Sequence, residues 1–338
     1  MRDERLSVAT PWRVLAGVVA AALLALGVGA LLVRAAGFSE VRQAVGRADA
    51  RWFAACLAAQ VVALWSYARV VRGAFAWGGR PDPGFRLNAH VSLATIGAAR
   101  VFAAGGVGAI AVAYWCFRRA RFRADEAFAR VLGLNVLFYV VFAAGVWTAA
   151  LATLLTDRGD VPRGLAVPWL LLVPLLAAVA IALTRPRREG SPDAGRSPIR
   201  RVLDWAISGL AWTRAVLTDR AGRRLLAVTA LYWVGNLACL WAALRSVGEN
   251  PTLTQLVLAF AAGHAAMILP LPLGGAGGVD AAMTYALTAV GIPLAAALVV
   301  VAVYRLFAFW VPTIPALVAL FSVRRAGARL EQLIPARP

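Results

Sequence analysis

The sequence contains no lysine, so all 35 basic residues are arginine, and there are only three cysteines, three methionines and two histidines. Cys56, Cys116 and Cys239 lie in apolar segments without paired spacing, which predicts small buried hydrophobic side chains and no disulfide. Cys, His and carboxylate residues nowhere show the spacing of a metal site, and no glycine motif follows a strand. We therefore expect no metal and no cofactor, and the sequence gives little support to an enzyme.

Long polar segments are also scarce. The chain is 61% hydrophobic with a mean hydropathy of +0.73, and apolar runs recur between residues 14 and 321. These values lie outside the range of soluble domains. We therefore expect an all-α polytopic membrane protein, in which the first apolar run is an anchor and not only a cleaved signal.

The net charge of +19 is spread over short loops, with no basic domain that would bind nucleic acid. Cytoplasmic loops of membrane proteins are rich in basic residues, and such residues attract anionic lipids. Arginines precede the first span and follow the last one, so both termini are expected in the cytoplasm. The densest basic cluster, Arg118, Arg119, Arg121 and Arg123, is expected on the same side.

The order of segments predicts six full spans and two short amphipathic helices at the membrane surface. The spans are residues 12–33, 52–71, 127–155, 165–183, 225–244 and 294–321. The surface helices are residues 38–50, where Ser39 is expected as the N-cap, and residues 199–217. A flexible cytoplasmic linker is expected at 184–200.

The segment Pro270-Leu271-Pro272-Leu273-Gly274-Gly275-Ala276-Gly277-Gly278-Val279-Asp280 interrupts the apolar pattern. Proline removes backbone donors and glycine disfavours helix, so the chain should break here. The arm after the break, residues 279–290, would reach only about 18 Å, whereas a bilayer core needs about 30 Å. Together with the arm at 252–269 it predicts a hairpin that enters the membrane without crossing it. Because broken backbone at membrane depth must be covered by protein or reached by water, the break is a candidate binding site.

A similar hairpin is expected in the first half, where residues 87–104 and 109–117 flank Gly105-Gly106-Val107-Gly108. Placing residue i on residue i+169 aligns Gly105, Gly106 and Gly108 with Gly274, Gly275 and Gly277. Three full spans per half invert the second half relative to the first, which is a transporter design. We expect a first repeat at 1–164 (hairpin 87–117), a second at 165–323 (hairpin 252–290) and a cytoplasmic tail at 324–338.

Charged residues inside apolar segments are costly, so they are the first functional candidates. Asp280 either offsets the dipole of the arm that it starts, or couples protons or a substrate charge. Arg305 either forms an ion pair with Asp280 or binds a substrate phosphate. Arg100 either extends to the cytoplasmic interface or lines the mouth of the first hairpin.

Uncharged candidates are the helix breaks and a few polar side chains. The arm that starts at Gly105, Gly106 and Gly108 has no acid in its first turn, so its N–H groups can accept an anion such as a lipid phosphate. His264 is either a packed histidine or a proton relay. Tyr304 is most simply explained by interhelical packing and hydrogen bonding.

The sequence resembles the transmembrane, flippase-like region of MprF-type lysylphosphatidylglycerol synthases and their stand-alone relatives. The resemblance lies in Pro270, Pro272, Gly274, Gly275, Gly277 and Asp280, followed by Tyr304 and Arg305. In this chain Leu273 separates Pro272 from the glycines, and an aspartate stands where glutamate is usual. The resemblance implies translocation of lipids between leaflets, whereas the soluble aminoacyl-transferase domain has no counterpart in the 17 residues after Phe321.

These observations predict a translocase of the bacterial inner membrane that moves a phospholipid or a lipid-linked head group. Arg305, Arg100, Tyr304 and the glycine breaks would bind the substrate, and Asp280 and His264 would couple charge. The alternative is a scaffold that does not transport and that recruits a lipid-modifying or envelope enzyme through the 184–200 linker. An intramembrane enzyme is a third hypothesis, which lacks a catalytic cluster. The sequence does not indicate an oligomeric state.

Overall fold

Long apolar helices dominate the computed structural model, which describes residues 36–101, 106–156, 161–183, 198–266 and 277–333 and single residues of the first predicted span. Five helical stretches are long and apolar enough to cross a membrane. They are α3 (Arg51–Ala76), α6 (Ala124–Thr156), α7 (Arg163–Leu183), α9 (Gly222–Ser246) and the continuous helix made of α13 (Leu294–Arg305), η2 (Leu306–Trp310) and α14 (Val311–Phe321). They coincide with five of the six expected spans, and the sixth, at 12–33, lies largely outside the described residues. The all-α polytopic membrane fold is confirmed.

Three further helices are amphipathic: α2 (Phe38–Gly46), α8 (Pro198–Thr218) and α15 (Val323–Leu333). The expectation that Ser39 caps α2 was wrong, because the helix begins at Phe38 and Gly37 is its N-cap. Gly37 has φ 88°, a value that glycine adopts without strain. The helix therefore begins two residues before the start that a Ser39 cap would give it. Most of the 324–338 tail belongs to α15. This helix packs against α4 and α5.

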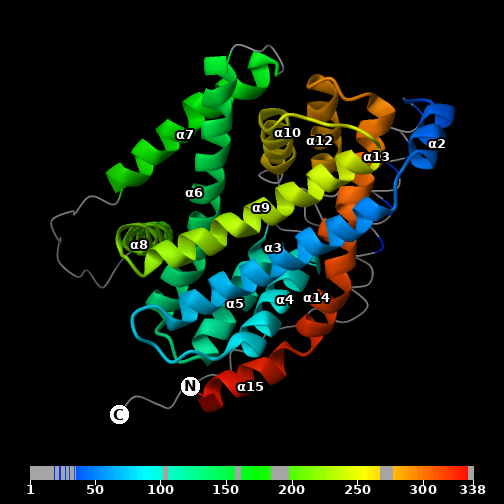
Figure 1. Cartoon of the computed structure of the whole chain (residues 1–338). Coiled ribbons are helices and arrows are strands. Elements are labelled where there is room, and N and C mark those ends of the chain that lie inside the picture. The colour runs from blue at the N-terminus through cyan, green and yellow to red at the C-terminus, as the bar shows by residue number, and fades with distance from the viewer. Residues whose placement is uncertain are drawn as a thin grey trace.

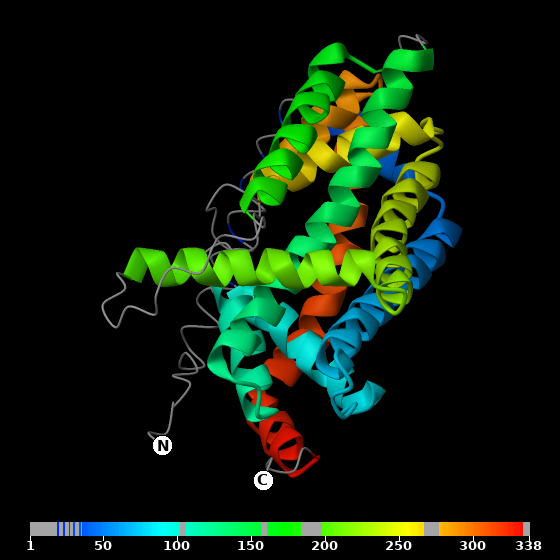
Figure 2. The ribbon, with the colours of Figure 1, turned by 90° about the vertical axis from the view of Figure 1, so that its left-hand side faces the viewer.

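Two pairs of shorter helices form hairpins: α4 (Phe85–Val101) with α5 (Val107–Arg119), and α10 (Leu253–Ala265) with α12 (Gly278–Ala289). Helix α4 has 17 residues and the other three have 12 or 13, so none reaches the roughly 30 Å of a bilayer core. Helix α10 ends four residues before the expected end of its arm, and the breaks at 102–105 and 267–276 lie outside the described residues. The two hairpins lie toward opposite ends of the long last helix (Figures 1 and 2).

Helices α3 and α9 run antiparallel and pack along most of their length. The rings of Trp52 and Trp241 are 5.2 Å apart at one end, and Gly73 contacts Leu225 at the other. At the crossing, a β-carbon built on Gly235 would lie 2.8 Å from the Ala59 carbonyl oxygen. The two backbones can approach this closely only because residue 235 has no side chain.

Four other helix contacts form two matched pairs. Helix α4 packs against α14, and α10 packs against α6; likewise α8 packs against α6, and α2 packs against α13. This pattern is the one expected of two halves arranged as an inverted repeat. The hairpins are therefore each covered by a long helix that lies in the other half of the sequence.

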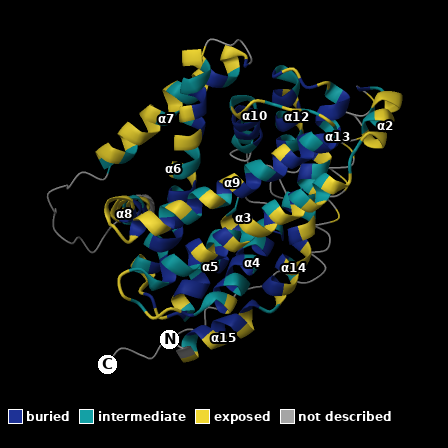
Figure 3. Cartoon of the chain, viewed as in Figure 1, coloured by how far each residue is buried: buried dark blue, intermediate teal, exposed yellow. Residues whose placement is uncertain are grey.

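Helix α7 differs from the other spans because its apolar surface is uncovered. Only Ala166 is buried in this helix, whereas Leu171, Leu175 and Leu176 are among its exposed side chains (Figure 3). It packs mainly on α6 and carries Pro168 and Pro174 in its interior. In a membrane protein an exposed apolar face of this kind contacts lipid chains.

Replacing a helix glycine by alanine usually raises stability. At Gly235 the same replacement should lower it, because α3 and α9 approach closely there. Gly235→Ala should lower the free energy of unfolding by about 1–3 kcal/mol, because the new methyl group meets the Ala59 carbonyl. Gly145→Ala in α6 is the matched control: nothing lies within 4 Å of its β-carbon position, so this change should leave stability unchanged or raise it by up to about 1 kcal/mol. Denaturation in detergent micelles measures both. Equal effects at the two sites would contradict close packing of α3 on α9.

Candidate functional site: a cavity beside the first hairpin

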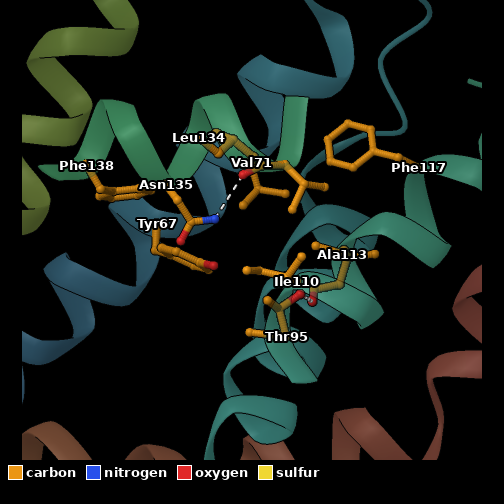
Figure 4. A pocket seen from close by; sticks show the side chains of 12 residues that line it. Tyr67, Val71, Thr95, Ile110, Ala113, Phe117, Leu134, Asn135 and Phe138 are labelled. Carbon is orange, nitrogen blue, oxygen red and sulfur yellow. Dashed lines mark hydrogen bonds between the residues drawn. The ribbon is translucent and has the colours of Figure 1, made fainter. Parts of the chain in front are cut away.

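A cavity of about 480 Å³ lies where the first hairpin meets four of the long helices. Its lining comes from α3 (Gln60, Ala63, Leu64, Tyr67), α4 (Thr95, Ile96, Ala99, Arg100), the start of α5 (Gly106, Ala109, Ile110), α6 (Asn135, Tyr139), α9 (Tyr232, Asn236) and the last helix (Ala308, Pro312). A smaller pocket of about 60 Å³ adjoins it and shares Tyr67, Thr95, Ala109, Ile110 and Asn135 (Figure 4). The recess therefore places several polar side chains among apolar ones, between membrane-spanning helices.

The first hairpin contributes a helix N-terminus to this cavity. Gly106 lines the cavity and is the N-cap of α5, with φ 89° in the left-handed region that glycine allows. The first N–H groups of a helix have no partner inside the helix, and α5 has no acidic residue in its first turn. Gly108 is buried in this turn, and Gly105 lies outside the described residues. The positive end of α5 is thus free to face an anion.

Arg100 is the one charged side chain among the described residues that line the cavity. Its Nη2 donates a hydrogen bond to the Ala308 carbonyl at 3.3 Å, and its guanidinium carbon lies 3.8 Å from the centre of the Phe309 ring. Its Nε is buried, and no acceptor in the described part of the chain bonds to it. Arg100 lines the cavity beside the first hairpin. A buried donor without a partner is costly, so this atom is a natural position for a ligand oxygen.

The carbonyl that holds Arg100 is available because of a proline. In a regular helix the N–H of residue 312 would bond to the carbonyl of Ala308, but Pro312 has no N–H. Ala308 lies in the stretch Leu306–Trp310, which is a π-helix. This form is rare in proteins, but where it occurs it often lies at a functional site. Pro312 and Pro315 in the last span are the sequence signal of this feature, which was not among the predictions.

Asp280 and Arg305 form a buried ion pair, with Oδ1 of Asp280 2.5 Å from Nε of Arg305 and side chains only 19% and 12% exposed. Oδ2 of Asp280 accepts a hydrogen bond from the Gly277 N–H at 3.0 Å, at the start of α12. The acid therefore caps α12 and neutralises Arg305 at once. The guanidinium carbon of Arg305 lies 4.7 Å from the Phe309 ring centre, so Arg100 and Arg305 share one aromatic neighbour, and only Arg305 has an acidic partner.

His264 and Tyr304 lie in an aromatic cluster outside the cavity lining. The centre of the His264 ring lies 4.1 Å from that of Phe260, 5.5 Å from that of Trp233 and 5.6 Å from that of Phe142. Its Nδ1 lies 3.3 Å from the Phe260 carbonyl oxygen. Tyr304 is 4% exposed and packs near Phe260. These positions are those of packing residues. Gly274 and Gly275 lie outside the described residues.

Several uncharged polar residues of the cavity were not among our sequence candidates. Gln60 donates to Oδ1 of Asn236 at 3.5 Å, and Asn236 donates to the Tyr232 carbonyl at 2.9 Å. Asn135 donates to the Val131 carbonyl at 2.8 Å, and Asn135 and Tyr139 are exposed. Amides and phenols within apolar spans were the available signal, since such groups need partners in a membrane. The described residues hold no group of three or more His, Cys, Asp or Glu side chains that could bind a metal.

The ion pair predicts strongly non-additive mutational effects. Asp280→Asn keeps an oxygen for the Gly277 N–H but leaves the buried Arg305 uncompensated, so it should lower the free energy of unfolding by about 3 kcal/mol. Arg305→Gln added to Asp280→Asn should cost much less than Arg305→Gln alone. A double-mutant cycle, followed by denaturation in detergent, measures this coupling. Additive effects would show that the two side chains do not stabilise one another.

The comparisons with known proteins agree with the resemblance drawn from the glycine break. The family described as "Lysylphosphatidylglycerol synthase TM region" matches residues 14–316. A comparison with curated proteins gave no match. Because the family match spans both hairpins, the cavity and nearly all of the long helices, this chain belongs to the lysylphosphatidylglycerol synthase TM region family.

Proposed function

We propose that this membrane protein moves a phospholipid or a lipid-linked head group between the leaflets of the bacterial inner membrane. The head group passes through the cavity beside the first hairpin, while the acyl chains stay in the bilayer. The observation that carries this proposal is Arg100, a cation inside the membrane-spanning bundle whose buried Nε lacks an acceptor in the described structure. A charge in such a place is expensive and is commonly functional.

A lipid phosphate suits this cation. Guanidinium binds phosphate through paired N–H groups, and the N-terminus of α5, with Gly106 and Gly108, adds backbone N–H groups at the same cavity. Arg100 is held by a neutral carbonyl and a ring face, so its charge is not cancelled. Asp280 and Arg305 balance each other's charge beside this site, which keeps the second hairpin neutral.

The cavity also gives a route from the lipid. Asn135 and Tyr139 on α6 are exposed, although both line the cavity, and Tyr139 is 55% exposed. An opening at these residues lets the head group enter sideways while its tails remain among lipid chains. The head group needs a polar path of this kind because charged groups are costly in hydrocarbon, whereas the acyl chains do not need one.

The matched helix contacts support an inverted repeat of residues 1–164 and 165–323. In such transporters one repeat moves against the other around a central site. The arginine-rich turn after α5 lies at the same end of the molecule as α15 (Figure 1), and we place this end and both termini in the cytoplasm. Anionic lipids of the inner leaflet would contact these arginines.

This proposal makes Arg100 the decisive side chain. Arg100→Gln in proteoliposomes should slow the movement of a labelled phospholipid between leaflets by about 10- to 100-fold, because a charge-assisted hydrogen bond is worth about 1.5–3 kcal/mol. Arg100→Lys should retain part of the rate, since it keeps the charge but loses the paired geometry.

Arg51→Gln is the matched control, because the Arg51 side chain is 90% exposed and lies outside the cavity lining. The control should transport as fast as the parent protein. If the parent protein moves the lipid no faster than protein-free vesicles do, the proposal is overturned. It would then favour a scaffold role, in which deletion of residues 184–200 abolishes function and Asp280→Ala does not.

A further inference from the structure

We infer that the molecule has a second phosphate site, formed by Arg80 and Arg130, at which a lipid head group binds before it reaches the cavity. This inference rests on the proposed function and adds the step by which the substrate enters. We call the place the entry site and define it as Arg80, Glu126, Arg130 and the ring of Phe122. It lies where α3 ends and α6 begins, and Phe122 belongs to the arginine-rich turn after α5.

The entry site contains two cations and one anion. Nη2 of Arg130 donates to Oε1 of Glu126 at 3.0 Å, and Nη2 of Arg80 donates to Oε2 of the same carboxylate. The guanidinium carbons of Arg80 and Arg130 lie 4.2 and 5.0 Å from the centre of the Phe122 ring. Two guanidinium groups around one ring repel each other, and one carboxylate compensates only one of them. A phosphate diester carries a single negative charge, so its binding would make the site neutral.

The donors of this site are only partly used. The Arg130 side chain is 7% exposed, and its Nη1 donates to the Ala74 carbonyl at 2.5 Å, in the last turn of α3. Its buried Nε has no acceptor in the described part of the chain, and Nε and Nη1 of Arg80 bond to no described acceptor either. Capping of α3 explains one nitrogen of Arg130. It does not explain the second arginine or the unpaired donors, which phosphate oxygens would satisfy.

Space for a ligand lies over the turn that leads from α3 to Arg80. Gly78 and Gly79 are exposed and have φ 75° and 74°, values in the left-handed region that glycine allows. A β-carbon built on Gly78 would meet only Nη2 of Arg130, at 3.9 Å, and one built on Gly79 would meet nothing within 4 Å. The space beside the Arg130 guanidinium is therefore open, and glycine lets a ligand approach the backbone there.

Aromatic rings separate the entry site from the cavity. Phe122 meets Phe117 edge to face with ring centres 5.2 Å apart, and Phe117 stacks on Phe75 at 4.1 Å. Phe117 also lines the smaller pocket, at the end away from Phe138 (Figure 4). This pocket shares part of its lining with the cavity that contains Arg100. The route that we propose therefore runs from the entry site past Phe117 into the smaller pocket and on to Arg100.

The first experiment measures binding to the full chain, purified in a nonionic detergent. The probe is dihexanoyl phosphatidylglycerol, a short-chain lipid, and Arg100→Gln is the background so that the cavity does not contribute. Adding Arg80→Gln should weaken binding by about tenfold or more, because charge-assisted hydrogen bonds are lost while Arg130 still holds Glu126. Adding Glu126→Gln should tighten binding by about tenfold, since the internal carboxylate no longer competes for the same N–H groups.

Two comparisons control this experiment. Arg51→Gln is the matched variant, because Arg51 lies at the opposite end of α3 and its side chain is 90% exposed. It should leave the binding of the probe unchanged. Inorganic phosphate, titrated in the same way, distinguishes a lipid head group from free phosphate. We expect it to bind at least about tenfold more weakly than the probe, because it lacks the apolar contacts of the acyl chains.

The second experiment connects the site to transport. In proteoliposomes, Arg80→Gln should slow the movement of labelled phosphatidylglycerol by about tenfold at a low content of this lipid. The rate should return to that of the parent protein at a high content, because a weakened entry site fills at a higher concentration. Arg100→Gln should stay slow at every lipid content.

The outcomes separate the two proposals. If the parent protein does not move lipid, the proposed function fails, whereas opposite binding shifts in Arg80→Gln and Glu126→Gln still support the phosphate site. If the parent protein moves lipid but neither substitution changes binding, the translocase stands and this inference is overturned. Inorganic phosphate that binds as tightly as the probe overturns it as well. Opposite shifts in binding, together with a rate that recovers at high lipid content, support it.

Discussion

The structure depends on one constraint: a helix that breaks inside a bilayer must have its exposed backbone groups satisfied by protein or water. The chain breaks twice, and each hairpin is covered by a long helix from the other half, α4 by α14 and α10 by α6. Close packing of α3 on α9, made possible at Gly235, holds these halves together. The cavity forms where the cover over the first hairpin is incomplete, beside Gly106 at the start of α5.

The two hairpins satisfy this constraint differently. At the second, Asp280 caps α12 and pairs with Arg305, so that helix dipole and cation are both balanced within the protein. At the first, α5 has no acid in its first turn, and Arg100 has only a neutral carbonyl and a ring. One hairpin is therefore electrostatically complete, and the other has a positive site that a ligand anion can complete.

Features that are local in sequence were predictable. Hydropathy located the long spans, and Gly106 and Gly277 lie at the starts of α5 and α12. One of the two roles considered for Arg305 was the ion pair with Asp280 that the structure contains. The polar side chains of the cavity were not predictable. Gln60 and Asn236 are 176 residues apart in sequence and meet only because α3 packs against α9. The Ser39 cap, in contrast, failed for a local reason, because the backbone of Gly37 allows α2 to begin at Phe38.

In the proposed translocase, release of the substrate is as important as its binding, and the surroundings of Arg100 suit both steps. A carboxylate on Arg100 would compete with a phosphate for the same N–H groups, as Asp280 does at Arg305. The Ala308 carbonyl, freed by Pro312, orients the guanidinium without neutralising it. Because this carbonyl lies in a π-helical turn of the last span, a small change in that turn would reposition Arg100 relative to the α5 N-terminus. In the proposed translocase, movement of this helix segment weakens both proposed phosphate contacts together, which is the coupling between conformation and affinity that alternating access requires.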